Sequence, residues 1–212
     1  MEESLRTYQS DAAKAVGISF AQDMIWPRYE GRSVGNLGQT VAHVLGASLP
    51  EALSPLEPDI LDGMTDGVRR VILLVMDAMG WLQLQRAMAA DEGTVFHRLA
   101  EKGRLLPITT TFLSTTNSVL SSIWTGRAPA AHGLLAYELY LREWMMVVEA
   151  ISFSSPHAPF GRVLEDWGFD PEAFLPVPSI AQTLTHEGVT CRGVIHKRFM
   201  RTPPSRMHFR GM

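Results

Sequence analysis

From residue 68 onward, short blocks of hydrophobic residues alternate with amphipathic stretches. Residues 71–76 form a continuous apolar, partly β-branched run, which is typical of a strand buried on both faces of a parallel sheet. Apolar positions at helical spacing over 82–90 and 116–124 predict helices. Further helices are expected at 94–101 and 179–186, and further strands at 104–108, 137–142, 145–151 and 189–195. This alternation predicts an α/β fold with helices on the faces of a mostly parallel sheet.

The first 67 residues do not show this alternation of hydrophobic blocks and amphipathic stretches. Glycines and a Trp26–Pro27 pair precede an apolar stretch at 37–45, which has helical spacing and ends at Gly46. Three prolines between residues 50 and 58 then predict a connector. We therefore divide the chain into a lead-in, 1–67, packed on the core, and a main domain portion, 68–212.

Composition and charge narrow the class of protein. The chain has 212 residues, of which 46% are hydrophobic and 19% charged, enough apolar material for one sizeable core. The formal net charge is −3 and no basic face is evident, which argues against a nucleic-acid polymer as partner. The apolar run at 71–76 is too short to span a bilayer, and the first residues do not resemble a secretory signal. A soluble, cytoplasmic protein without a membrane partner is expected.

Asp77 is the first candidate for a functional residue, because it directly follows the apolar run. In open α/β sheets, ligands bind beyond the carboxyl ends of the strands, so an acidic residue there is a candidate ligand. The alternative is that Asp77 caps the helix expected from residue 82, since aspartate is a favoured N-cap.

The second candidate is the hydroxyl-rich loop at 109–118, which runs into the helix expected at 116–124. A hydroxyl at a helix start faces unpaired backbone N–H groups and the positive end of the helix dipole, which suits an anion and a nucleophile. The alternative is again capping, by Ser114 or Thr115.

Together these segments resemble a known family. The run from Val71 to Gly80, the loop from Thr111 to Thr116, and the stretch from Ser121 through Thr125–Gly126 to His132–Gly133 resemble type I phosphodiesterases and nucleotide pyrophosphatases of the alkaline phosphatase superfamily. The likeness continues through residues 137–143 and, weakly, to Arg206. It implies an alkaline phosphatase-like α/β/α sandwich, of which this chain would hold the N-terminal portion.

The resemblance also implies a site. The family pattern places the nucleophile on Thr116 when positions are counted back from Thr125–Gly126 and forward from Phe112. Thr115 is the second choice. In the family, the residues matching Asp77 and Thr116 bind one of two Zn²⁺ ions, which would lower the pKa of the Thr116 hydroxyl. Asn117 is expected to contact the substrate, a small phosphodiester or nucleotide-like molecule.

The chain departs from the family pattern in its other metal ligands. The family supplies an Asp-x-x-x-His element and an Asp-His pair, and neither occurs in these 212 residues. We interpret His132, in the turn after the nucleophile helix, as structural. Tyr137 stands where nucleotide-cleaving members carry an asparagine, which argues against a nucleotide substrate. The site is therefore expected to be incomplete within this chain.

Three alternatives to a phosphoric ester hydrolase remain. The chain could be a non-catalytic fragment, because a sheet without its later strands leaves metal positions open. It could be a phosphotransferase or phosphomutase of the same superfamily. From a different class, it could be an α/β binding module in which Asp77 and Thr116 are caps.

Overall fold

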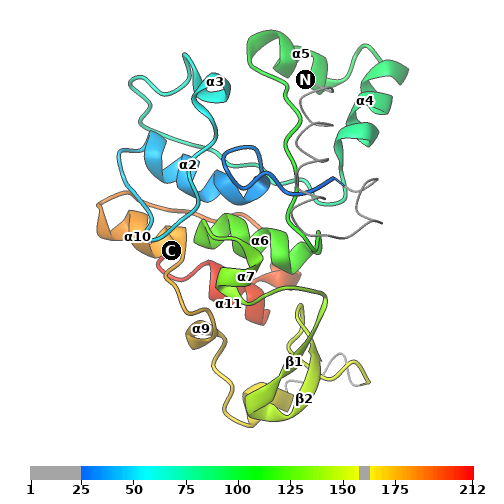
Figure 1. The fold of residues 1–212 in the computed structure, drawn as a ribbon, viewed down its shortest axis with the longest axis vertical. Coiled ribbons are helices and arrows are strands. Elements are labelled where there is room, and N and C mark those ends of the chain that lie inside the picture. Colours follow the sequence, from blue (N-terminus) through cyan, green and yellow to red (C-terminus); the bar gives the residue numbers. More distant parts are fainter. Residues whose placement is uncertain (1–24, 158–162) are drawn as a thin grey trace.

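A computed structural model describes residues 25–157 and 163–212 (Figure 1). Helices dominate this part of the chain, and its single sheet of regular strands is a two-stranded hairpin. In chain order the elements are η2 (Val34–Asn36), α2 (Leu37–Val44), α3 (Pro58–Leu61), α4 (Trp81–Ala90), α5 (Val95–Lys102), α6 (Thr116–Thr125), α7 (Pro129–His132), β1 (Glu138–Leu141), η3 (Arg142–Trp144), β2 (Met146–Glu149), α8 (Val163–Asp166), α9 (Pro171–Phe174), α10 (Ile180–His186), η4 (Lys197–Phe199) and α11 (Pro203–His208).

Helix α6 lies at the centre of the packing and contacts η2, α2, α7, α10 and α11 (Figure 1). It ends at Gly126, whose φ of 67° is the left-handed conformation that glycine adopts readily, and the Gly126 N–H donates to Ser122 O at 2.9 Å. Helix α2 crosses it closely: a Cβ added to Gly38 would lie 2.3 Å from Ile123 O. The predicted helix at 116–124 is confirmed.

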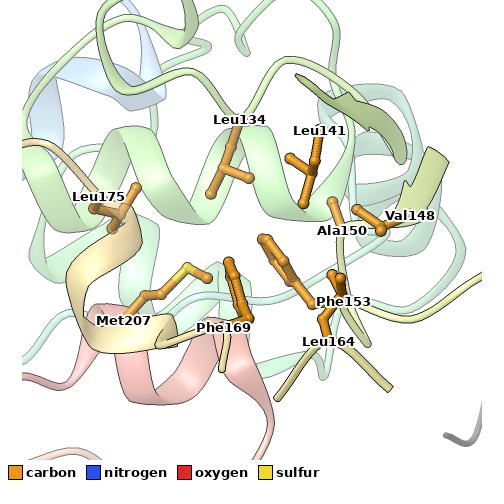
Figure 2. Close-up of a cluster of buried hydrophobic side chains, with 9 residues drawn as sticks. All are labelled: Leu134, Leu141, Val148, Ala150, Phe153, Leu164, Phe169, Leu175 and Met207. Carbon is orange, nitrogen blue, oxygen red and sulfur yellow. The ribbon is translucent and has the colours of Figure 1, made fainter. Parts of the chain in front are cut away.

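Two hydrophobic cores flank α6. The first joins the β1–β2 hairpin to α8, α9 and α11, with Phe153, Phe169 and Met207 at its centre (Figure 2). In the hairpin, Leu139 pairs with Val148 and Leu141 with Met146. The second core joins α2 to α10 through Ala42, Leu49, Ile180 and Leu184. The hairpin strands and the helix at 179–186 therefore match their predictions.

The expected central strands do not form in the described residues. Side chains of 71–76 are exposed, Ile72 by 94% and Leu74 by 78%. No backbone hydrogen bond joins this stretch to another described segment, and the strands expected at 104–108 and 189–195 likewise adopt no regular structure. A buried parallel strand is stabilised by ladder partners on both sides and helices on both faces, and the described residues supply neither. The parallel sandwich is thus not confirmed here.

Helices α4 and α5 follow the predicted positions but bury no residue. Val95 and Leu99, which share one face of α5, are exposed. They belong to the same region as the unpaired run at 71–76, so their apolar faces lack the sheet on which they would pack. No helix in the described ranges combines the length and apolarity needed to cross a membrane. The division at residue 67 stays a prediction.

Candidate active site

The hydroxyl-rich loop is held at both ends. At its start, Thr109 forms a parallel bridge with Ser33: Thr109 N donates to Arg32 O at 2.8 Å, and Val34 N donates to Thr109 O at 2.9 Å. At its end, the buried hydroxyls of Thr111 and Ser118 lie 3.4 Å apart, which ties the loop to the first turn of α6. Because both ends of the loop are fixed, the loop positions Thr116 at the start of the central helix.

Asp77 and Thr116 meet at this helix start, although 39 residues separate them in the chain. The Thr116 hydroxyl donates to Asp77 Oδ2 at 3.3 Å. The other carboxylate oxygen, Oδ1, accepts from the Ala78 N–H at 2.9 Å. Ala78 has a φ of 59°, a left-handed conformation that non-glycine residues seldom adopt and that forms a tight turn after Asp77. This turn holds the carboxylate against the helix start.

Neither Asp77 nor Thr116 is the N-cap of a helix, as the alternative interpretation required. The N-cap of α4 is Gly80, three residues after Asp77. The N-cap of α6 is Thr115, but its side chain makes no capping hydrogen bond. Asp77 and the loop hydroxyls are therefore not used to satisfy the backbone of these two helices.

Two polar groups next to Thr116 are buried without a partner in the described residues. Asn117 is 3% exposed, and its Nδ2 has no acceptor. The Oγ1 of Thr115 is also buried and unpaired. An unsatisfied buried polar group costs about 1–3 kcal/mol, so such groups concentrate where a ligand or function requires them. Thr116, in contrast, is partly accessible and hydrogen-bonded to Asp77.

Two buried histidines lie within hydrogen-bonding distance of serine side chains of α6. The sequence alone did not predict these pairs. His132 Nε2 lies 3.0 Å from Ser122 Oγ, and its Nδ1 accepts from the Leu134 N–H at 3.1 Å. His208, from α11, places Nε2 2.9 Å from Ser121 Oγ. The sequence sign of these pairs was two adjacent serines between apolar residues of the helix.

Both histidines are buried and hydrogen-bonded to serines of α6. Burial lowers the pKa of His132 to about 4. Burial lowers the pKa of His208 to about 3, with smaller contributions from His132 and Arg210. The neutral ring of His132 with its hydrogen on Nε2 satisfies both of its neighbours. These contacts fasten α7 and α11 to α6.

The described residues fit part of the metal site that the resemblance implies. Asp77 and Thr116 offer a carboxylate and a hydroxyl oxygen 3.3 Å apart, and both are donors that zinc accepts. No group of three or more His, Cys, Asp or Glu side chains in the described ranges is arranged to hold a metal ion. One cation could contact these two donors, and the ligands for a two-zinc centre are not assembled around them.

Comparison with known proteins gives one match. No curated protein and no solved structure matches the chain. A family model described as type I phosphodiesterase / nucleotide pyrophosphatase matches residues 71–208, which is more than half of the chain and includes Asp77, the hydroxyl loop and α6. The chain belongs to the type I phosphodiesterase / nucleotide pyrophosphatase family.

Proposed function

We propose that this chain carries the nucleophile of a metal-dependent hydrolase that cleaves phosphodiester or pyrophosphate bonds in small substrates. Thr116 is the nucleophile, and Asp77 is its partner and a metal ligand. The observation that carries the proposal is the 3.3 Å contact between Thr116 Oγ1 and Asp77 Oδ2 at the start of α6. Two residues that are distant in the sequence converge there without capping either helix.

The contact orients the threonine for attack. With its hydrogen directed at Asp77, the Thr116 oxygen keeps its lone pairs for an incoming phosphorus. Attack forms one O–P bond, breaks the P–O bond to the leaving alcohol, and leaves a phosphothreonine ester that water then hydrolyses. The alcohol takes up the proton that the threonine releases. Zinc held by Asp77 and Thr116 would lower the pKa of the hydroxyl and so raise its reactivity near neutral pH.

The surroundings of Thr116 suit the negative charge of a phosphoryl group. The first N–H groups of α6 have no partners within the helix and lie at the positive end of its dipole. The unpaired Nδ2 of Asn117 adds a candidate donor beside them. We assign substrate contact to Asn117, because its amide hydrogens have no other use in the described structure.

The nucleophile is tested by substitution in the full-length protein. Thr116→Ala should lower zinc-dependent hydrolysis of bis-p-nitrophenyl phosphate about a thousandfold or more, because the covalent step loses its attacking atom. Thr115→Ala is the matched control and should retain most of the rate. Both variants should fold, which circular dichroism and thermal unfolding check.

Mass spectrometry of a single turnover provides a second measurement. The adduct should lie on Thr116 in the wild-type protein and be absent from Thr116→Ala. An adduct on Thr115 would move the assignment by one residue. Full activity in both variants would contradict the covalent mechanism, and the absence of any adduct or turnover would contradict the proposed function.

A further inference from the structure

Positive charge is concentrated in one stretch of the chain, residues 188–212. This stretch holds six of the chain's 19 Lys and Arg residues and none of its 22 Asp and Glu residues. The formal net charge of the whole chain, −3, conceals this asymmetry. Such a separation of charge is typical of proteins that contact an anionic partner through one segment.

Only some of these cations are used within the described structure. Arg206 forms ion pairs with Glu165 at 3.1 Å and with Glu172 at 3.4 Å, and Arg210 donates to the backbone oxygen of Glu172. The cations that form no ion pair with a described residue are Arg192, Lys197, Arg198 and Arg201. All four are exposed, so their positive charges are available to a partner.

Three of the available cations lie on one short run of turns, residues 196–201, which we call the basic turn. The 3-10 helix η4 covers Lys197–Phe199, and residues 200 and 201 continue as a turn. Side chains three residues apart lie above one another in such turns, so Arg198 and Arg201 share one side of the basic turn. The positive charges are therefore presented together at the surface.

Apolar side chains lie between these cations. Phe199 is 46% exposed and Met200 is 62% exposed. The Arg198 guanidinium lies 5.8 Å from the centre of the Phe199 ring, within the range of a cation–π contact, and the His196 ring lies 6.2 Å from the same ring. These contacts hold Phe199 at the surface beside a positive charge, and it belongs to neither hydrophobic core.

The combination of cations and exposed apolar side chains favours a membrane surface as the partner. A nucleic acid or an acidic peptide would neutralise the cations without requiring Phe199 and Met200 beside them. The surface of a bilayer with anionic lipids offers phosphate groups to the cations and an apolar boundary to both of these side chains. Physiological salt screens charges beyond about 8 Å, so negative charge elsewhere on the chain acts weakly at the basic turn.

We propose that the basic turn binds the surface of membranes that contain anionic lipids. Its three cations contact the headgroup phosphates, and Phe199 and Met200 enter the boundary between the headgroups and the acyl chains. The inference goes beyond the proposed function and uses no residue of the candidate active site. It revises the expectation of no membrane partner, which rested on an apolar run too short to span a bilayer, because surface contact needs no spanning segment.

The test measures sedimentation of the full-length protein with vesicles of phosphatidylcholine alone or with about one third phosphatidylglycerol. The protein should bind the anionic vesicles at least about tenfold more tightly, and added salt should weaken this binding. A triple variant, Lys197→Gln, Arg198→Gln and Arg201→Gln, should lose at least about tenfold in affinity. The reason is that each cation near an anionic surface contributes about fivefold.

The matched control is a second triple variant, Arg86→Gln, Arg98→Gln and Lys102→Gln. It removes the same charge from exposed positions of α4 and α5 and should bind the anionic vesicles as the wild type does. Circular dichroism checks that both triple variants fold. If the first does not, Arg201→Gln alone should bind about fivefold more weakly than the wild type.

The apolar contact is tested separately with Phe199→Ser. This variant should bind the anionic vesicles about fivefold more weakly, because the ring no longer leaves water on binding. Trp167→Ser is the control, since Trp167 is 61% exposed and lies outside the basic turn. Unchanged binding by Phe199→Ser would overturn the apolar contact and with it the choice of a membrane.

The remaining outcomes decide between partners. Equal binding to both kinds of vesicle, or unchanged binding by the folded triple variant of the basic turn, would overturn the proposal. Tighter binding of polyuridylate or polyglutamate than of vesicles, dependent on the same three cations, would also overturn it and identify a soluble polyanion as the partner. Thr116→Ala should bind vesicles as the wild type does, so a failure of vesicle binding leaves the proposed hydrolase intact.

Discussion

Three consecutive polar residues at the start of α6 have different environments, and this difference separates their roles. The Thr116 hydroxyl is partly accessible and hydrogen-bonded to Asp77, whereas Thr115 Oγ1 is buried and unpaired. Asn117 is almost fully buried and leaves its Nδ2 without an acceptor. A buried polar group without a partner opposes folding, which supports the proposed contact between the Asn117 amide and a ligand.

At this scale we expect Asn117→Ala to separate activity from stability. Hydrolysis should fall about ten- to a hundredfold if Nδ2 contacts the phosphoryl group, while the free energy of unfolding changes by less than about 1 kcal/mol, because the packing lost with the side chain is offset by removal of an unsatisfied buried amide. Ser122→Ala is the comparison: it leaves His132 Nε2 unpaired and should cost about 1–3 kcal/mol. Urea unfolding and steady-state rates measure both. A large loss of stability in Asn117→Ala would contradict the assignment.

Helix α6 positions the candidate site because other elements fix it on several sides. Helix α2 approaches so closely at Gly38 that only a hydrogen atom fits against the backbone of α6. On its other side, Ser121 and Ser122 bind histidines from α11 and α7. The proposed nucleophile therefore lies on a helix whose position depends on segments from both ends of the described chain.

The close crossing makes Gly38→Ala a sharp test of this packing. The added Cβ would lie 2.3 Å from Ile123 O, so the helices must separate, and we expect a loss of about 2–3 kcal/mol. Gly93→Ala is the control, because the only neighbour of its new methyl group would be the exposed side chain of Asp91. Thermal unfolding of both variants measures the difference. Equal melting temperatures would contradict the close approach of α2 and α6.

At the scale of the molecule, two hydrophobic cores flank α6, and a third region contributes no residue to either core. The buried clusters join the hairpin to α11 and α2 to α10. The region from residue 68 to 108 contributes no residue to either cluster and exposes the apolar run at 71–76. Stability of the described structure therefore depends on the contacts around α6, including both buried histidines.

These histidines predict how stability changes with pH. Their pKa values are lowered from 6.5 to about 4 for His132 and about 3 for His208, so the unfolded chain binds more protons than the folded one between those values and 6.5. The contribution is complete above pH 6.5 and is lost as pH falls, at about 1.4 kcal/mol per unit for each histidine. His208→Gln should reduce this slope. Urea unfolding between pH 5 and 7 measures the slopes, and identical slopes in wild type and His208→Gln would contradict the prediction.

The sequence by itself determined those helices and strands whose signals lie in neighbouring residues. It also identified both residues of the candidate site, Asp77 and Thr116. Helical spacing predicted α2, with Gly46 at its end, and α6; α10 and the strands at 137–142 and 145–151, which form the hairpin, were also expected. The position of Asp77 after an apolar run and of Thr116 at a helix start predicted that they would lie near each other, as they do. The family match covers both residues.

Only the tertiary structure decided what depends on contacts between distant segments. The run at 71–76 has the composition of a central strand, but a strand exists only where neighbours complete its hydrogen bonds, and the described residues provide none. The His132–Ser122 and His208–Ser121 pairs and the unsatisfied amide of Asn117 likewise arise from the meeting of segments far apart in the chain. Periodicity along a sequence records which face of an element is apolar, but not which partner covers that face.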